Sequence, residues 1–188
     1  MNHPVFGSLT RDSLTHAWIG EVKLPTLAGC YVRWIPNVEC PDERDEKRKR
    51  GIFDLNILCR RGREPSPEQV AAYTYLLDNE TKVTDSLMTG ILRHFHELWF
   101  EDWEAEWKDK RLVQSIDTVT GIRETVSFLV LYVHAEAKEG QSYIGFDFGC
   151  DWHPHLSEHN LGVLMHRERV VATGQAETAF EFQGEILE

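Results

Sequence analysis

The first third of the chain contains short runs in which apolar and polar residues alternate, the two-residue period typical of β-strands. Three such runs, Trp18–Val22, Tyr31–Ile35 and Ile52–Leu58, predict three strands. Between the last two lies Pro41–Arg50, in which five basic and four acidic residues leave a net charge of +1. We interpret this charged segment as a solvated hairpin loop, because its charges nearly cancel.

Helical signals follow these strands. Ser66 is a capping residue, Pro67 occupies the first helical position and Gln69 completes a capping box, which predicts a helix over Pro67–Leu77. Its apolar positions recur at three- and four-residue steps, at Val70, Tyr73, Leu76 and Leu77. After a break at 78–80, a longer helix carries a similar stripe of Leu87, Met88, Ile91, Leu92, Phe95, Leu98, Trp99, Trp103 and Trp107. Gly90 lies inside this helix, which indicates that another element passes close to it.

The period returns to two in the last third of the chain. Val126–Val133 is apolar on both faces and predicts a central strand, and Tyr143–Cys150 predicts its hairpin partner, covered on one side only. Leu161–His166 and Val170–Thr173 predict a final hairpin. The sequence therefore predicts one α+β domain over 1–188, with an antiparallel sheet of N- and C-terminal strands and two mid-chain helices packed on one face.

The composition supports a globular, soluble chain. Of 188 residues, 41% are hydrophobic, and 20 basic against 31 acidic residues give a net charge of −11. This charge repels phosphate backbones and anionic lipids, so we expect neither nucleic acid nor a membrane as partner. The four cysteines form no C-x-x-C pair, no apolar run is long enough to span a bilayer, and no secretory segment is apparent. We therefore expect a cytoplasmic protein with reduced thiols.

A cluster of potential metal ligands follows the predicted strand Tyr143–Cys150. Its members are Asp147, Asp151, His153, His155, Glu158 and His159. Imidazoles and carboxylates together suit zinc, manganese or iron. Chance clustering of nine histidines is the alternative, because no signature such as H-E-x-x-H is present. His94 and Glu97 also have a di-metal spacing, but no second helix supplies the matching pair, so we interpret them as a helix face.

Two acidic segments are candidate protein-binding surfaces. The first follows the long helix and interleaves acids with tryptophans: Glu101, Asp102, Trp103, Glu104, Glu106 and Trp107. Tryptophan among acids is typical of an interface hot spot, although a solvated face over a tryptophan core is the alternative. The second is the acidic tail, residues 174–188, which has four acids and no base, with Phe180 and Phe182 among them. The sequence contains neither the G-x-S-x-G pattern of a nucleophile elbow nor a glycine-rich phosphate loop.

The segments Tyr143–Trp152, Glu158–Val163 and Arg169–Val171 together resemble a bacterial family of unknown function. Its C-terminal signature reads approximately G-F-x-F-x-C-x-W-D-x-E-H-G-L-G-V, and the resemblance covers roughly residues 50 to 175. It implies no particular activity, although some small acidic bacterial proteins of this general type are partners or immunity factors in toxin systems. Here His153 replaces the Asp after Trp152, and the segment Pro154–Ser157 lengthens the loop.

Within this signature, Asn160 replaces the usual glycine, and asparagine tolerates the left-handed turn that we expect there. We further expect Glu158 and His159 to fix the loop by hydrogen bonds and Gly162 to let Trp152 pack closely.

Two function classes follow. The first is a non-enzymatic module that binds a basic protein through its acidic surface without a cofactor. The alternative is a metal-dependent hydrolase that uses loop 147–159, with Asp151 or Glu158 as base.

Overall fold

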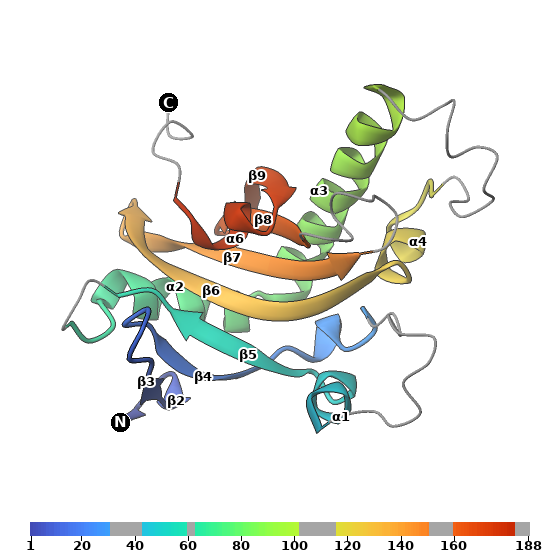
Figure 1. Ribbon diagram of the computed structural model, residues 1–188. Helices are drawn as coiled ribbons and strands as arrows, with labels where there is room; N and C mark the ends of the chain where they lie inside the picture. Colours follow the sequence, from blue (N-terminus) through green and yellow to red (C-terminus); the bar gives the residue numbers. More distant parts are fainter. Residues whose placement is uncertain (31–42, 60–62, 102–115, 151–159, 183–188) are drawn as a thin grey trace.

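The computed structural model describes residues 1–30, 43–59, 63–101, 116–150 and 160–182 (Figure 1). Within these ranges, seven strands form one sheet in the order β3-β4-β5-β6-β7-β8-β9. They are β3 (Thr10–Arg11), β4 (Trp18–Lys23), β5 (Ile52–Ile57), β6 (Val126–Lys138), β7 (Gln141–Cys150), β8 (Leu161–His166) and β9 (Arg169–Gln175). A separate small ribbon pairs β1 (Asn2–His3) with β2 (Gly7–Ser8), and a short 3-10 helix, η1, spans Pro25–Leu27.

The predicted α+β class is confirmed, and the sheet is mostly antiparallel. One pair differs, because β5 and β6 run parallel, with Leu55 opposite Leu131. Parallel neighbours need a crossover connection, and here the chain between the two strands forms helices before it returns to the sheet. The predicted central strand lies in the middle of the strand order as β6.

The mid-chain helices are α2 (Pro67–Asp78) and α3 (Glu80–Glu101), followed by the short α4 (Val119–Arg123). The predicted capping box is confirmed: the backbone N–H of Gln69 donates to the Ser66 side chain, and the Gln69 side chain accepts from the Ser66 N–H. Helix α2 packs on β6 and β7, and α3 packs on β8 and β9. Leu77 departs from the prediction, because it is 39% exposed while Leu76 is buried. Ala72 replaces it on the buried face of α2.

Gly90 of α3 lies against β9, as its position inside the helix predicts. A Cβ atom at this residue would lie 2.7 Å from Cγ2 of Val170. The missing side chain therefore lets α3 approach the sheet closely. Leu87, Met88, Ile91 and Phe95 of the predicted stripe are buried in the core that this contact closes.

The prediction of a hairpin loop over Pro41–Arg50 is wrong, because Glu43–Lys49 forms helix α1. All three acids of the helix lie in its first turn and three of its four bases lie in the last, which complements the helix dipole. Lys47 and Glu43 form an i,i+4 ion pair at 3.4 Å, and Lys49 and Glu46 an i,i+3 pair at 2.7 Å. The charged residues that we interpreted as a solvated loop therefore stabilise an exposed helix.

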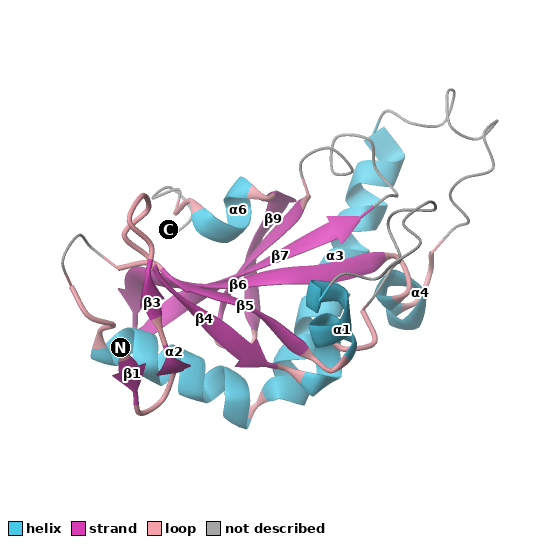
Figure 2. Cartoon of the chain, turned by 60° about the horizontal axis from the view of Figure 1, so that its bottom comes forward, coloured by secondary structure: helices cyan, strands magenta, loops and turns pink. Residues whose placement is uncertain are grey.

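Strand β7 is covered on both faces, so the expectation of one covered side is also wrong. Helices α2 and α3 lie on one face, and the C-terminal helix α6 (Glu177–Phe180) lies on the other (Figures 1 and 2). The predicted acidic tail starts inside the sheet, because β9 extends to Gln175. The expected strand Tyr31–Ile35 and the residues Trp103 and Trp107 lie outside the described residues.

In the part of the chain that the structure describes, no helix is long and apolar enough to cross a membrane.

Candidate functional site

The two faces of the sheet differ sharply in chemistry. Strand register places Leu55, Leu131, Phe146 and Val163 in a row on the face that α2 and α3 cover, and all four are buried. The residues next to them point to the opposite side, because successive strand residues alternate. There Asp54 and Asn56 of β5, Tyr132 of β6 and Asp147 of β7 share one surface, here called the polar face.

Asp147 is the most unusual side chain of the polar face. It is only 7% exposed, and its Oδ1 atom has no hydrogen-bond partner among the described residues. Burial raises the pKa of this carboxyl to about 6, against the opposing effect of a hydrogen bond with the Asn160 side chain. A buried carboxylate with an unsatisfied oxygen is costly, so Asp147 is a candidate functional residue.

Tyr132 lies beside the acids of the polar face, two residues along β6 from Val130, which is the strand neighbour of both Asp54 and Asp147. Its pKa is raised chiefly by burial and then by the negative charge of Asp147, with Asp54 adding to the effect. A hydrogen bond with the Asn56 side chain acts in the other direction. The tyrosine therefore stays neutral near physiological pH and offers a ring and a hydroxyl beside two carboxylates.

Helix α6 closes one end of the polar face. A Cβ atom on Gly145 would overlap the carbonyl oxygen of Ala179, and one on Gly162 would lie 2.8 Å from the Ala179 nitrogen. Only glycines allow this approach. The buried His134 secures the helix, because its Nε2 lies 2.8 Å from the Ala179 oxygen, so this ring nitrogen carries the hydrogen and donates it.

The second flank is helix α1, which brings a cation near the polar face. The positive charge of Arg48 lowers the pKa of Asp147, whereas the negative charge of Glu177 raises it. The Arg48 guanidinium has its own carboxylate partner, Asp45, at 3.8 Å. The described surroundings of Asp147 therefore hold both signs of charge.

Two of the residues expected to shape the signature loop are in the described region. Asn160 has φ 61°, which confirms the expected left-handed conformation. Gly162 does permit close approach, but the backbone that approaches runs from Gln175 at the end of β9 to Ala179 in α6. Trp152, which we expected to pack there, lies outside the described residues.

The predicted metal ligands Asp151, His153, His155, Glu158 and His159 also lie outside the described residues. Among the residues that are described, no group of three His, Cys, Asp or Glu side chains is placed to hold a metal ion. His94 and Glu97 lie on α3, where the Glu97 carboxylate is 3.8 Å from Arg93.

The acidic-tryptophan segment is also mostly outside the described residues, which exclude Asp102, Trp103, Glu104 and Trp107. Glu101 is the last residue of α3. In the second acidic segment, the aromatic rings pack on rings of this chain's own sheet. The ring centroids of Phe180 and Tyr132 are 5.6 Å apart, and those of Phe182 and Tyr143 are 5.0 Å apart. Glu177 and Glu181 are exposed beside them.

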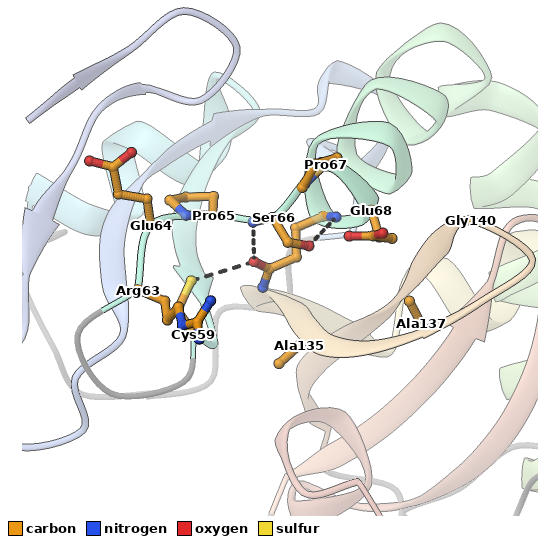
Figure 3. A pocket seen from close by; sticks show the side chains of 11 residues that line it. Cys59, Arg63, Glu64, Pro65, Ser66, Pro67, Glu68, Ala135, Ala137 and Gly140 are labelled. Atoms are coloured by element: carbon orange, nitrogen blue, oxygen red, sulfur yellow. Dashed lines mark hydrogen bonds between the residues drawn. The ribbon is translucent and has the colours of Figure 1, made fainter.

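A separate pocket of about 710 Å³ lies where α2 begins, against the end of β6 (Figure 3). The Cys59 thiol donates to the Gln69 side chain at 3.4 Å, and Gln69 in turn donates to the carbonyls of Leu58 and Val133. Burial raises the pKa of Cys59, so the thiolate needed for nucleophilic attack is disfavoured. The thiol and the amide at this pocket are already satisfied by hydrogen bonds within the chain. The pocket is therefore a weaker candidate for a functional site than the polar face.

Sequence reasoning included Asp147 among the ligands but missed Asp54, Asn56 and Tyr132. A signal was present, since Asp54 and Asn56 are the polar positions of an alternating strand. The partner strand could not be identified from that pattern.

Together, these features define an α+β unit with one apolar face under helices and one polar face that carries a buried acid. Residues 5–180 match the family described as "Domain of unknown function (DUF6985)", and the chain belongs to that family. The match extends well before residue 50, where we expected the resemblance to begin. No curated protein and no solved structure matches the chain.

Proposed function

We propose that the protein is a non-enzymatic binding module that recognises a basic protein, and that the polar face is part of its binding surface. The observation that carries this proposal is the placement of Asp54, Asp147 and the nearby Glu177 on the side of the sheet opposite α2 and α3. An immunity-like role, in which the chain masks a basic toxin, fits the same chemistry.

Electrostatics supports this choice of partner. The net charge of −11 attracts cationic proteins at long range, and complementary charge chiefly raises the rate of association. The acidic segment that begins at Glu101 and the exposed Glu177 and Glu181 extend this character beyond the polar face. The attraction weakens as salt rises past about 0.15 M, where the Debye length is about 8 Å.

The test begins with affinity capture from a lysate of the native host, followed by purification of the captured protein. Association rates are then measured for two double variants that change the net charge equally. Asp54→Asn with Glu177→Gln alters the polar face and its flank, whereas Asp78→Asn with Asp85→Asn alters exposed sites on α2 and α3.

We expect the first double variant to associate roughly 3- to 10-fold more slowly at low salt, and the second to match the wild type closely. Equal effects of the two double variants, or an acidic captured partner, would contradict the proposal.

A metal-dependent hydrolase is the second candidate, and one observation favours it. Asp147 lies near the end of β7, shortly before the histidine-rich loop, and its raised pKa is close to the range that a general acid or base requires. Purified protein would then contain near-stoichiometric transition metal, and His159→Ala would lose the metal without unfolding.

A further inference from the structure

We propose that the polar face receives an arginine side chain of the partner, with the Asp147 carboxylate as its acceptor and the Tyr132 ring as one wall. This inference rests on the proposed function, and it assigns the chemical group that the site binds. It makes Asp147 a specificity-determining residue rather than one contributor to a diffuse negative field.

Asp147 has an oxygen, Oδ1, that no described group satisfies. A buried acceptor without a donor loses hydration and gains nothing in return. Asn160 supplies one hydrogen bond to this carboxylate, and Oδ1 remains without a partner in the described part of the chain. A donor that arrives with a ligand would restore the missing hydrogen bond, and a cationic donor would also neutralise the charge.

The cation Arg48 of α1 already lies near Asp147 but does not neutralise it. Arg48 affects Asp147 through its charge, but its guanidinium pairs with Asp45 on the same helix at 3.8 Å. Glu177 acts oppositely and makes the surroundings of Asp147 more negative. Among the described residues, Asp54 of β5 and Glu21 of β4 follow Asp147 and Val130 along one row of the same face, and Glu21 pairs with Lys47 of α1 at 2.8 Å. Tyr132 of β6 lies beside this row and responds to the charges of both Asp147 and Asp54. The site therefore favours an additional positive charge over an anion.

The site suits arginine better than lysine. An ammonium ion is strongly hydrated, whereas a guanidinium is more weakly hydrated and stacks on aromatic rings. Asp147 is only 7% exposed, so a ligand must shed water to reach it. Tyr132 offers an aromatic ring, and the Phe180 ring packs against it with the two centroids 5.6 Å apart. The five N–H donors of a guanidinium also have further acceptors within the polar face, in Asp54 and Asn56.

The experiment titrates the full-length, isotopically labelled chain with arginine amide and follows backbone amide resonances. Lysine amide tests the preference for a guanidinium, and citrulline amide, of nearly the same shape but uncharged, tests the need for charge. We expect arginine amide to shift the resonances of Gly145, Gly149 and Asn160 with millimolar affinity, and citrulline amide to leave them unchanged. Lysine amide should bind several-fold more weakly.

Three variants make the test specific. Asp147→Asn should weaken arginine amide binding at least about 10-fold, and Tyr132→Leu should reduce the preference for arginine over lysine. Asp78→Asn, which makes the same change of charge on an exposed helix position, should bind as the wild type does. Absence of any shift up to about 50 mM arginine amide, or equal binding by wild type and Asp147→Asn, would overturn the inference.

The two proposals fail in different ways. If the purified basic partner binds Asp147→Asn as tightly as wild type but responds to Asp54→Asn with Glu177→Gln, the arginine site is refuted and the binding function stands. If arginine amide binds at Asp147 while no basic protein is captured, the site stands as a guanidinium site and the proposed protein-binding function fails.

Discussion

Replacing Asp147 by asparagine should stabilise the fold at neutral pH, even though the change removes a charged residue from a candidate site. In the folded chain this carboxyl has a pKa of about 6, against 3.8 for an ordinary aspartate. Each pKa unit corresponds to 1.36 kcal/mol, so its ionisation costs roughly 3 kcal/mol of folding free energy above the folded-state pKa. Asparagine has nearly the same shape and keeps a hydrogen-bonding group toward Asn160.

The sign of the pH dependence follows from the raised pKa. Well below the ordinary value of 3.8 the carboxyl is protonated in both the folded and the unfolded chain, so ionisation contributes no difference. Between about pH 4 and 6 the unfolded chain loses this proton first, and the contribution of Asp147 to folding stability falls as pH rises. The advantage of Asp147→Asn should therefore grow from about 0.5 kcal/mol near pH 4 to roughly 3 kcal/mol near pH 7.5.

Urea denaturation followed by tryptophan fluorescence, at several pH values, measures this difference directly. Asp78→Asn is the matched control, because it removes one negative charge from an exposed site and should change stability by less than about 0.5 kcal/mol. The reasoning is refuted if Asp147→Asn is less stable than wild type near pH 7.5. It is equally refuted if its advantage is the same near pH 4 as near pH 7.5.

Further predictions concern the packing, the metal and the acidic surface. Gly145→Ala should cost about 2–4 kcal/mol in chemical denaturation, because its Cβ overlaps the backbone of Ala179, whereas Gly149→Ala, with its nearest atom 3.8 Å away, should cost far less. Equal losses would show that α6 does not depend on this approach. As a binding module without metal, the protein should keep its melting temperature in a chelator, and a drop of several degrees would favour the hydrolase. Charge reversal at Glu101 and Glu104 should weaken partner capture, increasingly so at low salt, with the melting temperature nearly unchanged; capture indifferent to both reversal and salt would contradict this.

The elements that sequence predicted well are those whose cause is local. Helix α2 begins where Ser66, Pro67 and Gln69 require it, because a capping box satisfies backbone groups within four residues. The error at α1 was also local, since the same charges that suggest a solvated loop form ion pairs one turn apart in a helix. The net charge of Pro41–Arg50 does not depend on the order of its charges, whereas the stability of a helix does, because ion pairs form between residues three or four positions apart.

The polar face could not be predicted in the same way, because its residues come together only through strand order. Asp54 and Tyr132 are far apart in the chain, and they meet because β5 pairs with β6 in parallel, a neighbour that alternation along one strand does not specify. Only Asp147 was a candidate from sequence, and it was chosen for its proximity to histidines rather than for its burial.

The glycines of β7 show how one pattern supports opposite conclusions. Gly145, Asp147 and Gly149 alternate with aromatic residues, and small or polar side chains on one face normally indicate a surface open to solvent. In the structure, Gly145 is where another backbone comes closest, since a glycine in a strand also permits close approach. Asp147, two residues further along, is consequently buried beside the end of α6 instead of exposed. The packing that encloses this face also raises the pKa of the Asp147 carboxyl and leaves one of its oxygens unsatisfied. The capacity of Asp147 to bind a ligand therefore depends on Gly145, the glycine that lets α6 pack here.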